Sequence, residues 1–157
     1  MADKNSRKEM TTQSPEQTQE LGRRLGELTQ PGDVFLLTGK LGAGKTCLTQ
    51  GIAWGMDIDE YAASPTFVIM RELHGRLPLY HIDLYRLDKI EESIDLGLDD
   101  YLYGRGVCVV EWADKALSIL PLIDRVLARL PAANVLVTSG TVTSARLMGE
   151  HLPPRYR

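Results

Sequence analysis

Apolar side chains recur near the start of the chain with the spacing of a helix. Leu21, Leu25 and Leu28 are separated by four and three residues, which places them on one helical face. The sequence Ser-Pro-Glu-Gln at 14–17 supplies a capping hydroxyl, a proline at the first helical position and a glutamine three residues after the cap. We therefore expect a helix that begins there and closes near residues 31–32, where Pro-Gly follows.

Continuous apolar runs predict strands further along the chain. Residues 33–38 contain Val-Phe-Leu-Leu and are expected to form a strand, followed by a glycine-rich loop and a helix from about 45 to 55. The run Val-Cys-Val-Val at 107–110 is apolar throughout, which is typical of a strand that is buried on both faces.

Two strand candidates in the middle of the chain predict a hairpin. Residues 67–70 (Phe-Val-Ile-Met) and 77–82 (Leu-Pro-Leu-Tyr-His-Ile) are separated by His-Gly-Arg, and this spacing favours antiparallel pairing. A short helix is expected at 90–97. Further strands, which we expect to be antiparallel, fall at 125–130, 134–138 and 141–147.

The loop between the first strand and its helix has the pattern of a complete phosphate-binding loop. It reads Gly-Lys-Leu-Gly-Ala-Gly-Lys-Thr at 39–46, and its glycines allow a backbone that lets phosphate approach closely. Lys45 would place its ammonium against the β- and γ-phosphates, and the Thr46 hydroxyl can ligate a bridging Mg²⁺. The alternative is a glycine-rich turn with a solvated lysine. The candidate nucleotide-binding residues of this segment are Gly39, Leu41, Gly42, Ala43, Gly44, Lys45, Thr46 and Cys47.

These elements together predict a three-layer α/β domain of the P-loop NTPase type. Its central sheet is expected to be partly parallel, with antiparallel strands at its margins and the ligand at the carboxyl ends of the parallel strands. We expect a disordered lead at residues 1–13, a single domain at 14–150 and a flexible tail at 151–157.

Composition narrows the functional classes. The chain has 157 residues, of which 43% are hydrophobic and 25% charged, and its net charge of −3 argues against a wholly basic nucleic-acid-binding domain. No stretch has the apolar length needed to cross a bilayer, and no secretory signal pattern is present at the N-terminus. The two cysteines, Cys47 and Cys108, predict neither a disulfide framework nor a metal site, so we expect a cytoplasmic protein.

Hydrolysis or transfer of phosphate also requires a carboxylate that orients Mg²⁺, and two acids follow apolar strand candidates. Asp83 ends the run that begins at Leu79, and Glu111 ends the run at 107–110. Glu111 is the stronger candidate because its strand is more apolar. For either residue the alternative is a surface acid at the end of a strand.

A proline-stiffened segment lies between the loop helix and the hairpin. Its hydroxyls, at Ser64 and Thr66, could sense the γ-phosphate as a switch does. A turn followed by a strand start explains the same residues equally well.

Five blocks in order along the chain resemble the signature of the TsaE family, bacterial P-loop ATPases of tRNA threonylcarbamoyladenosine biosynthesis. The resemblance covers about residues 14–121, and it begins with a Thr-x-x-Leu-Gly helix pattern at residues 18–22. The chain departs from the family pattern at Lys40, where Asp is usual, and at Cys47, where Thr is more usual. Beyond about residue 122 the match is loose. The blocks are the loop at 39–46, Ser-Pro-Thr-Phe at 64–67, His-Ile-Asp-Leu-Tyr-Arg at 81–86, Leu-Gly-Leu at 96–98 and Glu-Trp at 111–112.

The resemblance implies specific roles for residues outside the loop. Thr46 and Glu111 would hold Mg²⁺, directly or through water, and Asp83 would order the metal or the attacking water. Thr66 would be the switch hydroxyl. Trp112 would lie close to the nucleotide, although a half-buried core tryptophan explains it equally well.

The resemblance also implies partners and a use for the ATP. Family members act with two proteins, TsaB and TsaD, and their slow ATP hydrolysis resets that complex, so that tRNA is contacted only through it. Two other classes remain open: a small-molecule kinase and an assembly factor that needs nucleotide binding without turnover. A kinase usually has a lid rich in arginine, whereas the arginines at 71, 76 and 86 are scattered.

Overall fold

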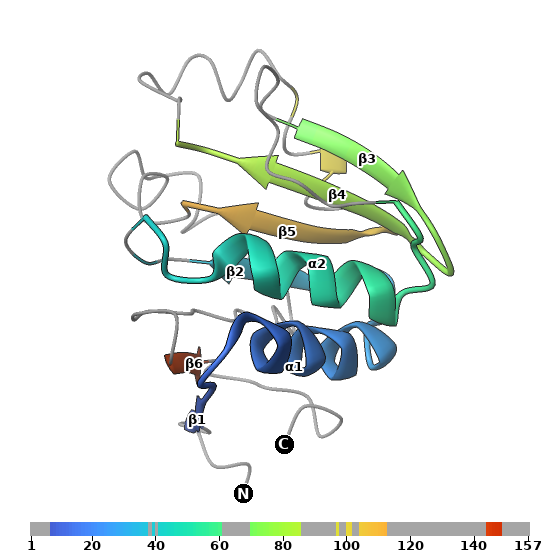
Figure 1. Ribbon diagram of the computed structural model, residues 1–157. Coiled ribbons are helices and arrows are strands. Elements are labelled where there is room, and N and C mark those ends of the chain that lie inside the picture. The colour runs from blue at the N-terminus through green and yellow to red at the C-terminus, as the bar shows by residue number, and fades with distance from the viewer. Residues whose placement is uncertain are drawn as a thin grey trace, which may run out of the picture.

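The computed structural model describes residues 7–37, 39, 41–60, 70–85, 97, 100–101, 104–112 and 144–148 (Figure 1). Strands and helices alternate over residues 7–55, and the hydrophobic pattern predicts the helix, strand and helix that follow the first strand. In chain order the elements are β1 (Arg7–Thr11), α1 (Pro15–Glu27), β2 (Val34–Leu37), α2 (Lys45–Gly55), β3 (Met70–His74), β4 (Pro78–Asp83), β5 (Val107–Glu111) and β6 (Ser144–Met148).

The main sheet has four strands in the order β2-β5-β4-β3. β5 pairs in parallel with both β2 and β4, and β3 joins β4 antiparallel at the edge. This confirms a partly parallel α/β sheet with an antiparallel strand at its margin. In this register Leu37, Glu111 and Asp83 stand side by side at the carboxyl ends of three neighbouring strands. The glycine-rich loop, which follows β2, therefore starts at the same edge of the sheet as the two acids.

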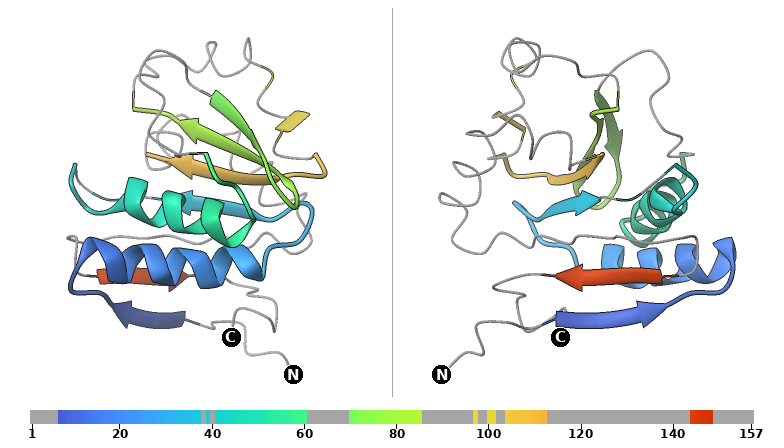
Figure 2. Two further views of the ribbon diagram at one scale, coloured as in Figure 1. Left: turned by 45° about the vertical axis from the view of Figure 1, so that its right-hand side comes forward. Right: turned by 90° about the vertical axis from the view of Figure 1, so that its left-hand side faces the viewer.

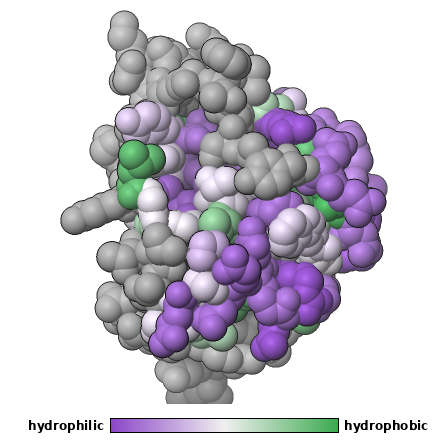
Figure 3. Space-filling model, viewed as in Figure 1, coloured by the Kyte–Doolittle hydropathy of each residue, from purple (hydrophilic) through white to green (hydrophobic). Residues whose placement is uncertain are grey.

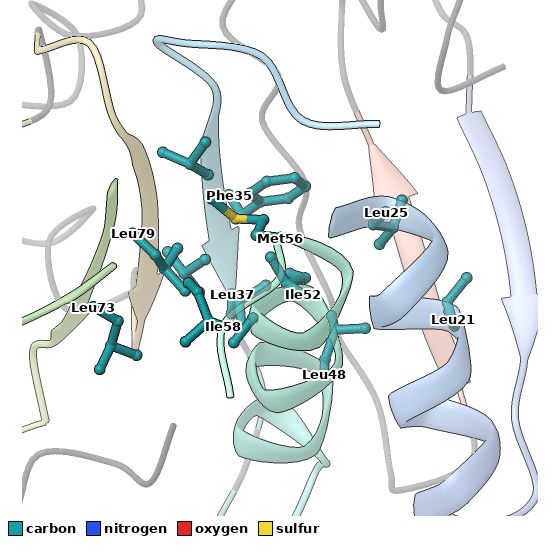
Figure 4. Packing of buried hydrophobic residues seen from close by; sticks show 13 residues of the cluster. Leu21, Leu25, Phe35, Leu37, Leu48, Ile52, Met56, Ile58, Leu73 and Leu79 are labelled. Carbon is teal, nitrogen blue, oxygen red and sulfur yellow. The ribbon is translucent and has the colours of Figure 1, made fainter. Parts of the chain in front are cut away.

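One face of the sheet is covered by α2, and α1 packs alongside α2 (Figures 1 and 2). Side chains from both helices and from the sheet meet in one buried apolar cluster (Figure 4). The opposite face carries a second buried cluster, and β5 is buried at all five positions, which confirms its predicted central place. The layer expected beyond that second face lies outside the described residues. The labelled members of the first cluster are Leu21, Leu25, Phe35, Leu37, Leu48, Ile52, Met56, Ile58, Leu73 and Leu79.

The two helices approach so closely that their backbones are in contact. A Cβ atom built on Gly26 would lie 2.1 Å from the carbonyl oxygen of Ile52, and one built on Gly55 would lie 2.1 Å from that of Arg23. Both distances are far shorter than a Cβ contact allows, so only glycine fits. Because α2 begins at Lys45, this packing also fixes the helix that carries the end of the phosphate-binding loop. The four glycines at the contact are Gly22, Gly26, Gly51 and Gly55.

The start of α1 confirms the predicted cap. The hydroxyl of Ser14 accepts a hydrogen bond from the backbone N–H of Gln17 at 3.2 Å, and the Gln17 side chain accepts one from the backbone N–H of Gln13 at 2.7 Å. Leu21 and Leu25 are buried as expected, whereas Leu28 lies past the helix end and is 40% exposed. Hydrophilic residues predominate in the coloured part of the surface on the face that Figure 3 shows. No helix among the described residues is long and apolar enough to cross a membrane.

Residues 7–11 differ from the disordered lead that we expected at 1–13. They form β1, which pairs antiparallel with β6 to make a separate two-stranded sheet. The local sequence, Arg-Lys-Glu-Met-Thr, has no apolar run that would predict a strand. The strand forms by pairing with a segment far away in the chain, which the local sequence does not reveal. The segment 144–148 overlaps the strand expected at 141–147.

The predicted hairpin is confirmed, and its first strand extends further along the chain than expected. β3 covers Met70–His74, so it includes residues that we had expected to connect the strands, and residues 67–69 of the expected strand lie outside the described residues. Only Leu73 of this edge strand is fully buried, and the residues on either side of it are polar. The segment therefore contains no apolar run from which the whole strand could be predicted. The helix expected at 90–97, the strands at 125–130 and 134–138 and the tail at 151–157 lie wholly or almost wholly outside the described residues.

Candidate functional site

The glycines of the phosphate-binding loop adopt backbone conformations that other residues rarely reach. Their φ angles are 143° at Gly39, 79° at Gly42 and 91° at Gly44. A Cβ on Gly42 would meet no atom within 4 Å, so its glycine is required by conformation and not by space. Gly44 is the cap of α2, and its carbonyl accepts the N–H of Leu48 at 2.9 Å. The loop therefore turns directly into a helix N-terminus, where backbone N–H groups favour an anion.

Lys45 is held at the base of this loop. Its side-chain Nζ donates a hydrogen bond to the carbonyl oxygen of Gly39 at 2.8 Å, and it lies 4.1 Å from the centre of a ring of Trp112. The residue is only 6% exposed. A buried ammonium between a carbonyl and an aromatic face could exchange these contacts for an anion that enters the loop, because phosphate oxygens are stronger partners than either.

The first turn of α2 contacts the end of β5. The hydroxyl of Thr46 donates to Oε1 of Glu111 at 3.1 Å, although the two residues are 65 positions apart in sequence. Glu111 is 1% exposed, so its carboxylate is buried beside the loop. The structure thus brings together the two residues that we expected to hold Mg²⁺.

Asp83 completes a pair of carboxylates at this edge of the sheet. It is half-buried and accepts a hydrogen bond from the backbone N–H of Tyr85 at 2.9 Å. Burial raises the pKa of Asp83, and the neighbouring negative charge of Glu111 raises it further, against the opposing effects of the Tyr85 N–H, His81 and Lys45. Two adjacent carboxylates of this kind favour a cation between or beside them.

The donor set at this edge fits Mg²⁺. A hydroxyl and carboxylate oxygens are the hard ligands that Mg²⁺ prefers, and Mg²⁺ commonly takes one or two carboxylates together with substrate phosphates. Among the described residues no group of three or more His, Cys, Asp or Glu side chains is placed to hold a metal ion. Thr46 and Glu111, with Asp83 nearby, are accordingly the described residues that could hold Mg²⁺ together with a nucleotide.

Trp112 lies at the site and stands in an unusual backbone conformation. Its φ of 57° is in the left-handed region, directly after the last residue of β5. One side of the indole faces Lys45, and the ring of Tyr85 lies 4.9 Å from it, centre to centre, at 48°. Trp112 was expected either beside the nucleotide or as a half-buried core residue. The structure agrees with both interpretations, since the side chain is half-buried and lies beside the loop lysine.

Sequence reasoning missed His81. Its side chain is 0% exposed, and its Nε2 lies 2.6 Å from Oε2 of Glu111. The signal was the His-x-Asp spacing, because positions 81 and 83 share one face of β4 and stand in register with Val109 and Glu111. The contact of Tyr85 with Trp112 was missed as well, and no signal in the sequence pointed to it.

The remaining candidates are distributed as follows. Leu41 stands 85% exposed at the tip of the loop, and Ala43 and Cys47 are partly buried beside it. Thr66 and Lys40 lie outside the described residues, so the switch hydroxyl and the unusual loop lysine stay predictions.

Comparison with known proteins identifies close relatives. Residues 12–138 match the family described as "Threonylcarbamoyl adenosine biosynthesis protein TsaE". A protein of Treponema pallidum named "tRNA threonylcarbamoyladenosine biosynthesis protein TsaE" is 44% identical over 110 residues, which cover 70% of this chain and 82% of the relative. The protein of the same name from Bacillus subtilis is 49% identical over 111 residues, covering 70% and 69%. The crystal structure of Bacillus subtilis YdiB superposes with a TM-score of 0.68 and 34% identity over 92% of this chain and 88% of the other.

Proposed function

Because the chain belongs to the TsaE family of threonylcarbamoyl adenosine biosynthesis proteins, we propose that it binds ATP with Mg²⁺ and hydrolyses it slowly in the threonylcarbamoyladenosine modification of tRNA. The observation that carries this proposal is the hydrogen bond between Thr46 and Glu111. It couples the end of the phosphate-binding loop to the carboxylate of a central strand, which is the pairing that a metal–nucleotide site requires.

In this proposal the loop binds the phosphates and Lys45 moves from the Gly39 carbonyl to the β- and γ-phosphate oxygens. Thr46 and Glu111 hold Mg²⁺, which neutralises negative charge on the phosphates when it is bound. Asp83 orients the attacking water. Its raised pKa makes its carboxylate a better proton acceptor than an ordinary surface aspartate.

We further propose that the chain acts on a complex of TsaB-like and TsaD-like proteins and meets tRNA only through that complex. The names of the relatives in Treponema pallidum and Bacillus subtilis support a place in this modification. The net charge of −3 supports an indirect role toward tRNA, because a protein that grips nucleic acid by itself usually presents excess positive charge.

The test is to measure ATP hydrolysis by the purified protein alone and with TsaB-like and TsaD-like proteins added. We expect a slow Mg²⁺-dependent rate that changes when both partners are present. A Lys45→Ala variant serves as the control for contaminating ATPases. The proposal fails if the partners leave the rate unchanged and the protein has no effect on tRNA modification.

A further inference from the structure

We propose that His81 is a positioning residue for the carboxylate of Glu111. Its Nε2–H holds Oε2 so that Oε1 faces Thr46 and the metal position. This inference rests on the proposed function, since it assigns a part to His81 in building the Mg²⁺–nucleotide site. Neither the loop pattern nor the acids at the strand ends account for a histidine that is 0% exposed at this place.

The two oxygens of Glu111 are engaged from different elements. Oε2 is 2.6 Å from Nε2 of His81 on β4, whereas Oε1 is 3.1 Å from the hydroxyl of Thr46 on α2. When both oxygens of a carboxylate are hydrogen-bonded, the rotation of the group about its last C–C bond is fixed. The hydrogen bond from β4 therefore decides which oxygen is presented toward the loop.

The hydrogen bond also selects the tautomer of His81. An ionised carboxylate oxygen only accepts, so with Glu111 ionised we infer that the ring carries a proton at Nε2. The other ring nitrogen, Nδ1, is buried and has no hydrogen-bond partner among the described residues. With the proton at Nε2, the single N–H of the neutral ring donates to Glu111. The lone pair at Nδ1 then has no partner among the described residues, whereas the other tautomer would leave a buried N–H without an acceptor.

His81 acts through Glu111 and does not contact the reaction itself. The His81 side chain is fully buried, and its hydrogen bond in the described part of the chain runs to Oε2 of Glu111. If a metal binds, the Thr46 hydroxyl could ligate it through a lone pair and still donate its proton to Oε1, so Thr46 and His81 together would hold the Glu111 carboxylate. Burial is the main cause of the raised pKa of Asp83, and the negative charge of the neighbouring Glu111 adds to it. The hydrogen bond from His81 holds the Glu111 carboxylate in place beside this second acid.

The test measures nucleotide affinity by calorimetry in EDTA and in Mg²⁺, and compares the gain in affinity that Mg²⁺ provides. His81→Leu removes the donor, and His81→Gln replaces it with an amide N–H at a similar reach. Leu79→Ala is the matched control, because Leu79 is fully buried on the same face of β4 and does not contact Glu111. We expect His81→Leu to lose about 10-fold or more of the Mg²⁺ gain, as outer-shell partners of metal ligands typically do. His81→Gln should restore most of it, and affinity in EDTA should stay unchanged.

Either of two affinity results would overturn the inference: a full Mg²⁺ gain in His81→Leu, or an equal loss in Leu79→Ala, which would indicate a purely structural role. If wild-type protein shows no Mg²⁺-dependent nucleotide binding, the proposed function itself fails. Should His81→Leu not fold, ¹⁵N NMR of the wild-type imidazole decides the question without nucleotide. We expect a protonated Nε2 and an unprotonated Nδ1, and the opposite tautomer would refute the positioning bond.

Discussion

Replacing Gly26 by alanine gives the sharpest test of the helix packing, because two effects of opposite sign compete. Alanine is the better helix former by about 1 kcal/mol, so helix propensity alone predicts a more stable protein. The structure predicts the reverse. The new Cβ would lie 2.1 Å from the carbonyl oxygen of Ile52 and 2.9 Å from the Cα of Gly55, so α1 and α2 must separate by roughly 1 Å to admit it.

The size of the loss follows from what that separation loosens. Overpacking of a core contact costs typically about 1–3 kcal/mol and occasionally more. This contact lies at the high end, because the clash is with rigid backbone and because a gap of about 1 Å would weaken the packing of buried leucines across the interface. Taking about 3 kcal/mol for the contact and subtracting about 1 kcal/mol for propensity leaves a net loss of about 2 kcal/mol. For a protein of this size that corresponds to a melting temperature lower by roughly 4–8 °C.

Chemical denaturation and thermal melting of Gly26→Ala and wild type measure this difference directly. Gly32→Ala is the control, since a Cβ on Gly32 meets no atom within 4 Å and only its φ of 89° opposes the change. Gly26→Ala should be the more damaging of the two. A Gly26→Ala protein as stable as wild type, or more stable by the helix-propensity amount, would refute the close contact between α1 and α2.

Three further changes test other parts of the structure. Arg76→Met should lower the free energy of unfolding by about 1–3 kcal/mol in urea, because the guanidinium donates to the carbonyl and hydroxyl oxygens of Thr29 past the end of α1; an unchanged stability would contradict that capping role. Thr46→Val should keep nucleotide binding in EDTA and lose most of the gain from Mg²⁺, measured by calorimetry, and an intact gain would exclude the hydroxyl as a ligand. Iodoacetamide at pH 8 should alkylate Cys47 and spare Cys108, since burial raises the pKa of Cys108 to about 12; peptide mass spectrometry checks this, and early modification of Cys108 would show that β5 is accessible.

Elements with a strong local pattern were predictable from the sequence. The cap at Ser14, the leucine spacing of α1 and the apolar runs of β2 and β5 each encode their structure within a few neighbouring residues. β1 was not predictable in this way, and β3 was predicted only as the first strand of the hairpin, without residues 71–74. One pairs with a segment far away in the chain and the other is an edge strand with polar positions, so neither needs an apolar run of its own.

The residues of the candidate site also differ in whether a local sequence pattern predicts them. The loop and Glu111 were predictable, because a glycine-rich pattern and an acid at the end of an apolar strand are local signals. The contact of His81 with Glu111 depends on the register between β4 and β5. The contact of Tyr85 with Trp112 depends on the turn of the chain at Trp112. Such information is set by tertiary packing, and a single sequence does not display it.

The central claim is that ATP hydrolysis at Glu111 and the loop serves tRNA modification. The most direct measurement counts threonylcarbamoyladenosine formed per complex, using this protein, TsaB-like and TsaD-like partners, unmodified tRNA and ATP. Wild-type protein should support many rounds of modification. The Glu111→Gln variant, once calorimetry has checked that it binds ATP, should stop after about one round. Repeated rounds with Glu111→Gln would contradict the claim and indicate an assembly factor for which nucleotide binding is enough.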